Sequence, residues 1–467
     1  MATDLKPDMR RGYGNKERPV IGELWKRDAT AISDVMTAEG TYHPSNKNLD
    51  YSRYYDPEFF KLEIEKVWRR QWLVAGREED IPATGDRFPL SVGPDAYLVV
   101  RTGADEFKAY FNSCLHRGAM LCSKRESAAT IRCPYHGWEW GIDGSLKKIP
   151  SHWDFQELTR LNASLPEVKI ERWGGFLFIN ADPDSAPLSE SLGILPAHFA
   201  SFELENRYTK ARFRKLVGAN WKASQEAFLE SYHLYATHPE GVPFNGDSQS
   251  QYDIFPTPNG AIGREAVPSA VPSMHADSSA TPAAAAAAFA QVAQMWHYPS
   301  AELPEIDPAK DVRAQIGAWA RQAYEMTYGR KNTQPDAIML DSLLYFMYPQ
   351  FCMWLSEAVP FAYQFLPHES DPNLSYFDVR LLMPYAEGEA APPAAEIVEI
   401  GLTESIAEKA PLFGFLGMIF DQDMSNMPLV QRGMKAANPS AAFSNLGTYQ
   451  EALMQHWHEL IDRDIAR

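Results

Sequence analysis

The chain has 467 residues, of which 45% are hydrophobic, with 12 Trp, 21 Tyr and 24 Phe. This length exceeds the usual size of one hydrophobic core, so we expect two domains in a well-packed globular protein. The formal net charge of −17 argues against a nucleic-acid binder, whose affinity depends on Lys and Arg neutralising phosphates.

Cysteine usage and the N-terminal composition point to the cytoplasm. The first twenty residues lack the apolar segment of a signal peptide, and no stretch reaches the length of a membrane span. Only four cysteines occur, and two of them lie in the motif described below, which argues against a disulfide scaffold. We therefore expect a cytoplasmic protein that binds neither membranes nor nucleic acids.

The N-terminal third divides into a polar arm and a β-rich domain. We assign residues 1–57 to an N-terminal arm that joins the catalytic domain, with an early basic cluster formed by Arg10, Arg11, Lys16 and Arg18. A helix is predicted from Pro57 because apolar residues follow at helical spacing: Phe60, Ile64, Val67 and Trp68. Residues 58–180 are assigned to one domain. From about residue 72, short alternating runs interrupted by Gly and Pro predict a small antiparallel β domain.

Two loops in this domain, CLHRGA and CPYHGW, each contain one cysteine and one histidine: Cys114 and His116, then Cys133 and His136. Thiolates on one iron and imidazoles on the other form the ligand set of a Rieske 2Fe-2S centre. The alternative is a structural zinc site with the same four ligands. Zinc loops usually begin with two cysteines two to four residues apart, so the pattern favours the cluster. Imidazole ligands raise its potential to roughly −150 to +300 mV, which suits an electron-transfer intermediate.

With these two segments the chain resembles the large (alpha) subunits of Rieske non-haem iron oxygenases, the aromatic-ring-hydroxylating dioxygenase family. The resemblance implies an α+β fold: a β-rich Rieske domain and a helix-grip-like catalytic domain, here residues 181–467, with an antiparallel sheet covered by helices. It implies mononuclear Fe(II) beside the 2Fe-2S cluster, and NAD(P)H electrons that arrive through a ferredoxin and/or a flavin reductase. Because electrons pass between subunits in this family, it also implies a homotrimer or an α3β3 assembly.

The expected catalytic domain begins with a long helix over about 219–237, followed by a polar stretch to residue 282. The alanine run after residue 282 predicts a helix that is either packed or lid-like. Three aromatic and β-branched segments, 342–355, 361–368 and 375–385, predict strands of a second sheet. A helical region is expected over about 395–467.

The first helix carries two histidines that fit a mononuclear iron site. An iron that binds O2 needs two histidines and one carboxylate on one face of its octahedron, with other positions open. His233 and His238 supply the pair. Five residues correspond to about 140° on an ideal helix, so the helix must end between them, with His233 in its last turn. Pro239 supports this because it disfavours helical geometry at His238.

Two glutamates precede these histidines. Glu226, Glu230 and His233 are spaced as one helical stripe, which can also be an ordinary solvated acidic face. The resemblance gives Glu230 the catalytic role of the acid that bridges a Rieske histidine, His136 of one subunit, to the iron of its neighbour. Most ring-hydroxylating members have aspartate there and asparagine where this chain has Ala227. Members with glutamate include enzymes that oxidise quaternary ammonium compounds.

The resemblance places the third iron ligand in the segment 419–433. Asp423 matches the liganding aspartate, and Asp421 is a near neighbour that we consider less suitable. Either residue can instead be a helix N-cap, a common role for an aspartate just before a helix. We predict the iron ligands to be His233, His238 and Asp423.

Two further groups of residues allow alternative interpretations. Basic residues near the cluster loops can steer an acidic electron carrier or can simply be solubilising: Arg117, Lys124, Arg125, Arg132, Lys147 and Lys148. Aromatic and apolar residues in the later strands suggest an apolar, aromatic substrate, although each residue alone is more typical of core: Leu343, Tyr345, Met347, Phe351, Trp354 and Tyr363.

We therefore predict the terminal oxygenase component of an enzyme that dihydroxylates an aromatic ring with O2. One alternative uses the same metals for monooxygenation, by O- or N-demethylation or quaternary-amine oxidation. A second alternative is a Rieske electron-transfer protein, which does not need the mononuclear iron.

Overall fold

The computed structural model describes residues 20–41, 48–158, 163–277 and 280–467. The chain divides into two compact units. The larger unit comprises Met1–Phe60, Ser189–Pro367 and Pro372–Arg467, and the smaller comprises Lys61–Leu188 and His368–Asp371. Both helices and sheets are present, as expected for the α+β class. The basic cluster expected at residues 10–18 lies outside the described residues.

The smaller unit is the predicted antiparallel β domain. Within the described residues it contains a seven-stranded sheet of order β2-β11-β10-β5-β4-β3-β6 and a three-stranded sheet of order β7-β8-β9, with antiparallel pairing throughout. The strands are β2 Leu73–Arg77, β3 Asp86–Val92, β4 Asp95–Gly103, β5 Glu106–Phe111, β6 Glu126–Ser127, β7 Thr130–Arg132, β8 Glu139–Gly141, β9 Leu146–Lys148, β10 Glu167–Trp173 and β11 Phe176–Asn180.

A helix does begin at Pro57, as the apolar spacing predicted. It runs as α3, Pro57–Glu63, and continues as a π-helical turn over Ile64–Trp68. Ile64, Val67 and Trp68 are all buried. The boundary between the two units, after Phe60, falls inside this helix.

The larger unit is built on one curved sheet. In the described part of the chain its eight strands have the order β13-β14-β15-β16-β17-β18-β12-β19. All neighbours pair antiparallel except β12 and β19, which are parallel, so the expected antiparallel sheet has one parallel edge strand. The strands are β12 Arg207–Val217, β13 Gln251–Thr257, β14 Gly260–Val267, β15 Ser342–Met347, β16 Phe351–Trp354, β17 Phe361–Pro367, β18 Ser375–Pro384 and β19 Ile397–Ile400. A separate pair joins β1 Leu49–Asp50 to β20 Phe443–Ser444.

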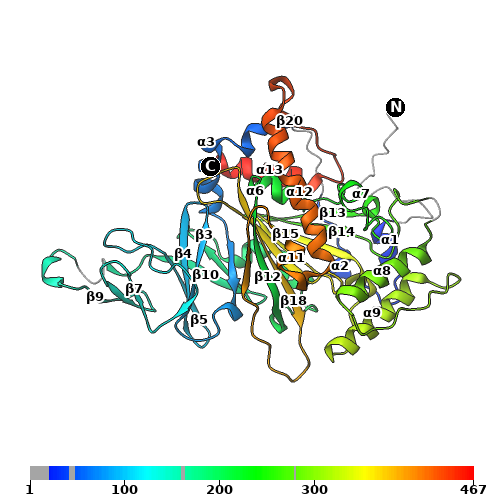
Figure 1. Cartoon of the computed structure of the whole chain (residues 1–467), viewed down its shortest axis with the longest axis horizontal. Coiled ribbons are helices and arrows are strands. Elements are labelled where there is room, and N and C mark those ends of the chain that lie inside the picture. The colour runs from blue at the N-terminus through cyan, green and yellow to red at the C-terminus, as the bar shows by residue number, and fades with distance from the viewer. Residues whose placement is uncertain (1–19, 42–47, 159–162, 278–279) are drawn as a thin grey trace. The chain divides into compact units, whose positions relative to one another are not determined.

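Helices cover this sheet, as Figure 1 shows for α12, which runs across the strands. The alanine run forms α8, and its small buried side chains allow α9 to pack beside it in a shared apolar cluster. The helices of the unit are α4 Leu188–Leu192, α5 Leu195–His198, α6 Trp221–Glu226, α7 Leu234–Thr237, α8 Pro282–Trp296, α9 Val312–Tyr328, α10 Asp336–Leu340, α11 Ile406–Lys409, α12 Phe415–Ala436 and α13 Ala452–Ile465.

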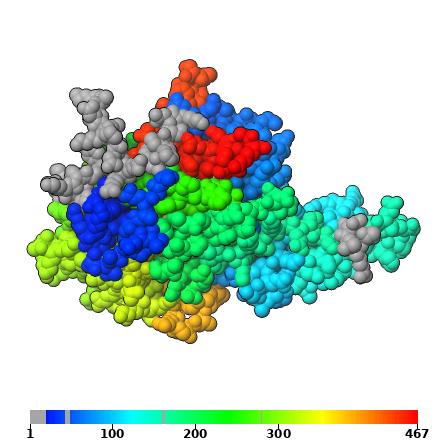
Figure 2. Space-filling model, turned by 180° about the vertical axis from the view of Figure 1, so that it is seen from behind, coloured from blue at the N-terminus to red at the C-terminus, as the bar shows by residue number. Residues whose placement is uncertain are grey.

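The segment of residues 20–41 packs on the rest of the larger unit through specific bonds. It contains α1 Ile21–Trp25 and α2 Asp34–Thr37. The Trp25 indole N–H donates to Asp341 at 2.9 Å, and the guanidinium of Arg313 bridges Asp28 and Asp341. In Figure 2 this segment, dark blue, lies on the surface of the larger unit. None of the helices in the described ranges combines the length and hydropathy that crossing a membrane requires.

Candidate metal centres

The segment that carries both iron-site histidines is not one helix. The predicted helix over 219–237 is interrupted: α6 begins after Asn220, whose side chain accepts the Lys222 backbone N–H, and ends at Glu226. Non-helical turns follow before α7. The expectation that His233 lies in the last turn of the first helix was therefore wrong. His233 directly precedes α7 and His238 directly follows it, so this four-residue helix separates the two rings.

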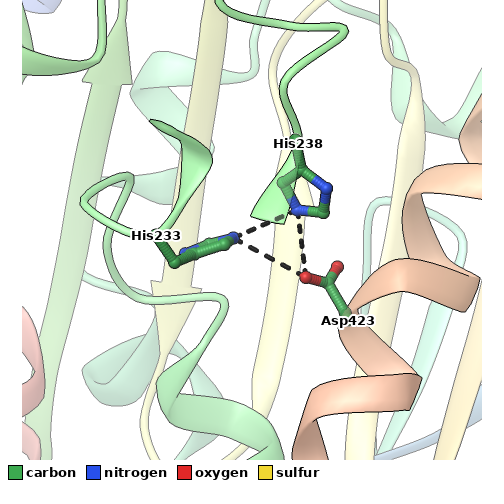
Figure 3. A group of neighbouring side chains, drawn as sticks. All are labelled: His233, His238 and Asp423. Carbon is green, nitrogen blue, oxygen red and sulfur yellow. Dashed lines mark hydrogen bonds and ion pairs between the residues drawn. The ribbon is translucent and has the colours of Figure 1, made fainter. Parts of the chain in front are cut away.

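This local structure brings three side chains to one point. Figure 3 shows His233, His238 and Asp423 pointing toward one another, with Asp423 contributed by α12. The two histidine Nε2 atoms are 3.2 Å apart, and Asp423 Oδ1 is 3.0 Å from His238 Nε2 and 3.7 Å from His233 Nε2. Two ligands at right angles, each about 2.1 Å from a metal ion, lie roughly 3 Å apart, so this spacing suits one ion.

Hydrogen bonds fix the orientation of both imidazoles. His233 Nδ1 lies 2.7 Å from Glu230 Oε1, and His238 Nδ1 lies 2.8 Å from Gln422 Oε1. Because both oxygens are acceptors, each Nδ1 carries the proton, and each Nε2 presents its lone pair to the common point. Ligand histidines characteristically donate their second N–H in this way. Two such lone pairs at 3.2 Å repel one another unless a positive charge lies between them.

The surroundings of the three residues favour positive charge. Burial lowers the pKa of His233, but the charge and hydrogen bond of Glu230, together with Asp423, raise it to about 9, so a metal ion at Nε2 would replace a proton that the ring otherwise holds there. Asp423 is 3% exposed, and its Oδ1 makes no hydrogen bond within the described residues. A buried carboxylate oxygen without a hydrogen bond lies next to two histidine nitrogens that are directed at the same point. This arrangement suits a divalent metal with two nitrogen ligands and one oxygen ligand.

The second aspartate considered, Asp421, has a different role. Both Asp421 and Asp423 lie inside α12, so neither caps its own helix. Asp421 instead caps α11: it accepts the Ser405 hydroxyl at 2.6 Å and the backbone N–H of Ile406 at 2.7 Å.

Glu226 and Glu230 do not share one stripe, because the turn after Glu226 redirects the chain. Glu226 Oε1 accepts the Tyr54 hydroxyl at 2.6 Å and lies 2.6 Å from His458 Nε2. Burial raises the pKa of Glu226 to about 8. Of these two glutamates, only Glu230 faces His233 and His238.

A cavity of about 200 Å³ adjoins the three residues and is mostly apolar. Its walls include Phe228, Phe244, Phe289, Trp296, Leu344, Trp354, Phe361 and Phe420. Of the aromatic-strand residues named from the sequence, only Trp354 is among them. Side chains alternate between the two faces of β15, so Ser342 and Leu344 line the cavity. Tyr345 faces the other side, where its hydroxyl lies 2.8 Å from His198 Nδ1.

Glu265 in β14 also lines the cavity and was not among the site residues predicted from the sequence. It is 4% exposed, and burial raises its pKa to about 8 against the lowering effect of Ser231 and Tyr252. The alternation of side chains along a strand could have indicated that Glu265 faces the cavity, because its neighbour Arg264 faces the opposite side and pairs there with Asp253.

In the smaller unit, the two Cys-His loops have the same backbone design. Gly118 N–H donates to the Cys114 carbonyl at 2.8 Å, and Gly137 N–H donates to the Cys133 carbonyl at 3.1 Å. Both glycines have positive φ, +75° and +73°, which a side chain would strain. The turns bring His116 Nδ1 within 3.1 Å of His136 Nδ1.

The four side chains of these loops differ in exposure. Cys114 and Cys133 are buried and not disulfide-bonded, whereas His116 is half-buried and His136 is exposed. Slight desolvation, then the charges of His116 and Arg117, lower the pKa of His136. The arrangement fits a cluster with inner thiolates and outer imidazoles, through which an electron can enter or leave.

Comparison with known proteins supplies the family. Residues 71–159 match the Rieske 2Fe-2S domain, and residues 197–467, more than half of the chain, match the ring hydroxylating alpha subunit (catalytic domain). The Rieske match favours the cluster over structural zinc.

Among curated proteins, the chain is 32% identical over 216 residues to the glycine betaine monooxygenase oxygenase subunit of Chromohalobacter salexigens, covering 46% of this chain and 47% of that protein. It is 33% identical over 200 residues to the large oxygenase component of the naphthalene 1,2-dioxygenase system of Pseudomonas putida, covering 40% and 43%. The matches thus span about half the length of these relatives.

A solved structure of a quaternary ammonium Rieske monooxygenase in complex with L-carnitine superposes with a TM-score of 0.60 at 16% identity, covering 91% of this chain and 96% of that one. This likeness establishes the fold. The chain therefore belongs to the family of ring-hydroxylating alpha subunits, in which a Rieske 2Fe-2S domain accompanies a catalytic domain that binds mononuclear iron.

Proposed function

We propose that this chain is the terminal oxygenase component of a Rieske oxygenase and that it monooxygenates a small methylated or quaternary amine. One observation carries the oxygenase assignment: His233, His238 and Asp423 converge beside a mostly apolar cavity. A Rieske electron carrier needs neither the second ligand set nor a cavity next to it.

Each residue at the iron site has a distinct role in the proposal. His233, His238 and Asp423 bind the iron, which supplies the open coordination positions where O2 reacts beside the substrate. Glu230 and Gln422 hold the two Nδ1 protons and so keep both Nε2 atoms directed at the iron. The apolar walls exclude water, and substrate sits against them without binding the metal.

The electrons are proposed to come from NAD(P)H through a flavin reductase, with or without a ferredoxin. Cys114, His116, Cys133 and His136 hold the 2Fe-2S cluster. The exposure of His136 supports electron transfer at this surface, and Lys124, Lys147 and Lys148 nearby are exposed as well. Positive side chains around such an exit would steer an acidic partner toward it.

We also propose a trimer in which Glu230 relays electrons from His136 of one subunit to the iron of the next. Exposed tyrosines next to both sites support a contact between copies: Tyr135 is 59% exposed beside His136, and Tyr232 is 62% exposed beside His233. Large aromatic side chains on a surface are typical of places that a partner covers.

Two observations favour an amine over an aromatic ring, which was our first interpretation. Glu230 occupies the position where quaternary-amine oxidisers of the family carry glutamate, and the glycine betaine monooxygenase subunit is among the relatives. Dihydroxylation of an aromatic ring is the second candidate, because the cavity walls are apolar and a naphthalene dioxygenase component is also a relative. A dry apolar cavity of about 150 Å³ binds benzene in another protein, so about 200 Å³ suits small molecules of either class.

The function is tested by iron analysis followed by product analysis. Purified wild type should hold about three irons per chain, two of them in the cluster. His233→Ala should lose about one iron and keep the visible spectrum of the cluster, whereas the control His456→Ala on α13 should keep all three. Unchanged iron in His233→Ala would support the electron carrier instead.

The substrate class is then read from the product. Wild type is incubated with a reductase, NADH, labelled O2 and a panel of methylated amines and aromatic compounds. The proposal expects one atom of O2 in the organic products and the other in water; where a methyl group is removed, the inserted oxygen leaves in formaldehyde and the amine carries no label. A cis-dihydrodiol with two labelled oxygens would establish the second candidate.

A further inference from the structure

A row of side chains from four strands crosses one wall of the cavity. Cross-strand pairing places Glu265 of β14 opposite Leu344 of β15, and Leu344 opposite Trp354 of β16. Directly paired residues project from the same face of a sheet. Trp354 stacks on Phe361 of β17, with ring centroids 5.1 Å apart and planes inclined by 27°. All four residues line the cavity.

Aromatic rings extend this wall toward the iron ligands. Phe361 lies edge-to-face with Phe420 at 5.6 Å, and Phe420 lies 6.2 Å from Phe228. Phe420 belongs to α12, three residues before Asp423, and Phe228 lies two residues before Glu230. The wall therefore runs from Glu265 across the aliphatic Leu344 to aromatic rings that reach the helix carrying Asp423.

Glu265 is the acid of this cavity that the histidine pair does not engage. Glu230 is bonded to His233, and Asp423 lies 3.0 Å from His238. Glu265 Oε1 is buried and has no hydrogen-bond partner within the described ranges. None of the described residues that line the cavity is Lys or Arg. Burial favours the protonated form of Glu265, and a cationic ligand would favour the ionised form and give the free oxygen a partner.

The neighbouring hydroxyls of Ser231 and Tyr252 hydrogen-bond to the carboxyl group of Glu265 but leave its Oε1 without a partner. The Ser231 hydroxyl lies 2.9 Å from the Tyr252 hydroxyl, and the Ser269 hydroxyl donates to Asn245 at 3.2 Å. Glu265 is therefore the polar group best placed to receive a ligand. Aromatic rings and a carboxyl group that line one cavity can together recognise a quaternary ammonium group, through cation–π attraction and charge.

We infer that Glu265, with Trp354 and Phe361 on the same cavity wall, binds the cationic head of the substrate and sets the specificity of the cavity for a positively charged amine over a neutral molecule of the same shape. This inference rests on the proposed function, since it assigns the recognition of the same substrate. It concerns a specificity residue and gives Glu265 no part in oxygen chemistry or iron binding.

The test measures binding and requires neither O2 nor a reductase. Choline and its neutral carbon isostere, 3,3-dimethylbutan-1-ol, are titrated by calorimetry into the full-length protein with its metals bound. The variants are Glu265→Gln, which removes the charge and keeps the shape, and Glu265→Asp, which keeps the charge. Glu325→Gln, at an exposed position on α9, is the control for an equal change of charge.

We expect wild type and Glu325→Gln to bind choline about tenfold or more tightly than the alcohol. In Glu265→Gln this ratio should fall close to one through weaker binding of choline, with the affinity for the alcohol little changed. Glu265→Asp should retain part of the preference. The iron content and cluster spectrum of Glu265→Gln should equal those of wild type, which also establishes that the variant is folded.

Three outcomes would overturn the inference: no saturable binding of choline to wild type, an equal preference in wild type and Glu265→Gln, or loss of iron from Glu265→Gln. The last would make Glu265 part of the metal site. None of them bears on the iron analysis of His233→Ala, so the oxygenase assignment and the role of Glu265 fail separately.

Discussion

Glu230 bonds to His233 twice: Oε2 accepts the backbone N–H at 2.9 Å, and Oε1 accepts the Nδ1 proton at 2.7 Å. The first bond holds the turn that precedes α7, and the second fixes the plane and tautomer of the ring. One carboxylate thus determines both where the histidine lies and which nitrogen it presents to the iron site.

Replacing Glu230 should separate these effects. Glu230→Ala removes both bonds, and loss of such a partner typically weakens metal binding about 10–100-fold. Glu230→Gln keeps an acceptor for Nδ1 and should retain iron, while slowing turnover because the negative charge is gone. Iron retained after dialysis against a graded chelator measures the difference, with Glu325→Ala as control. Equal retention by Glu230→Ala and wild type would contradict the assigned role.

The two aspartates of α12 should behave differently on substitution. Asp423→Ala should lose the mononuclear iron and keep the cluster. Asp421→Ala should keep the iron but lose the cap of α11, which costs about 1 kcal/mol of unfolding free energy. Iron analysis and denaturant unfolding of the same two preparations check this. Loss of iron from Asp421→Ala would exchange the two assignments.

Lysines near the cluster loops should govern reduction by the partner protein. The double variant Lys147→Glu, Lys148→Glu is expected to be reduced more slowly at low salt. The difference should shrink above 0.1 M salt, where the screening length is about 10 Å. Arg125 is left intact because it lies 3.3 Å from the buried Asp80. Stopped-flow reduction measures the rates, with Lys310→Glu, Lys331→Glu in the larger unit as control. Identical rates at every salt concentration would show that the lysines are only solubilising.

Asp378 in β18 should make the free energy of unfolding depend on pH in the acidic range. Burial alone would raise the pKa of Asp378, but the guanidinium groups of Arg212 and Arg214 hold it well below its usual range. A lowered pKa in the folded state means that the stabilisation is complete above about pH 4 and is lost as the pH falls further.

The variant Asp378→Asn should therefore be less stable than wild type at pH 7, by about 3 kcal/mol, because both arginines lose their buried partner. The gap should stay constant above about pH 5 and narrow as the pH falls below about 4, because the unfolded wild type then binds a proton that Asp378 in the folded protein does not take up. Denaturant unfolding at several pH values measures it. A gap that stays constant with pH would rule out ionised Asp378 as the source.

The sequence by itself determined the ligand motifs and the order of the elements. Cys114 with His116 and Cys133 with His136 are each contained in one short loop, so their spacing alone specifies the turn that gathers them. The strands of the smaller unit and the alanine-rich helix followed from local periodicity in the same way. These features depend on neighbours within a few residues, and such contacts can be read from the sequence.

Tertiary structure decided which side chains meet across long distances in the chain. Asp421 and Asp423 are two residues apart on α12, yet one caps α11 and the other faces the histidine pair, because 3.6 residues per turn sends them in different directions. The break after Glu226 and the cavity face of β15 were likewise not predicted, and Glu265 was missed. Each depends on which face of an element packs inward, and this is set by strands and helices from distant parts of the chain.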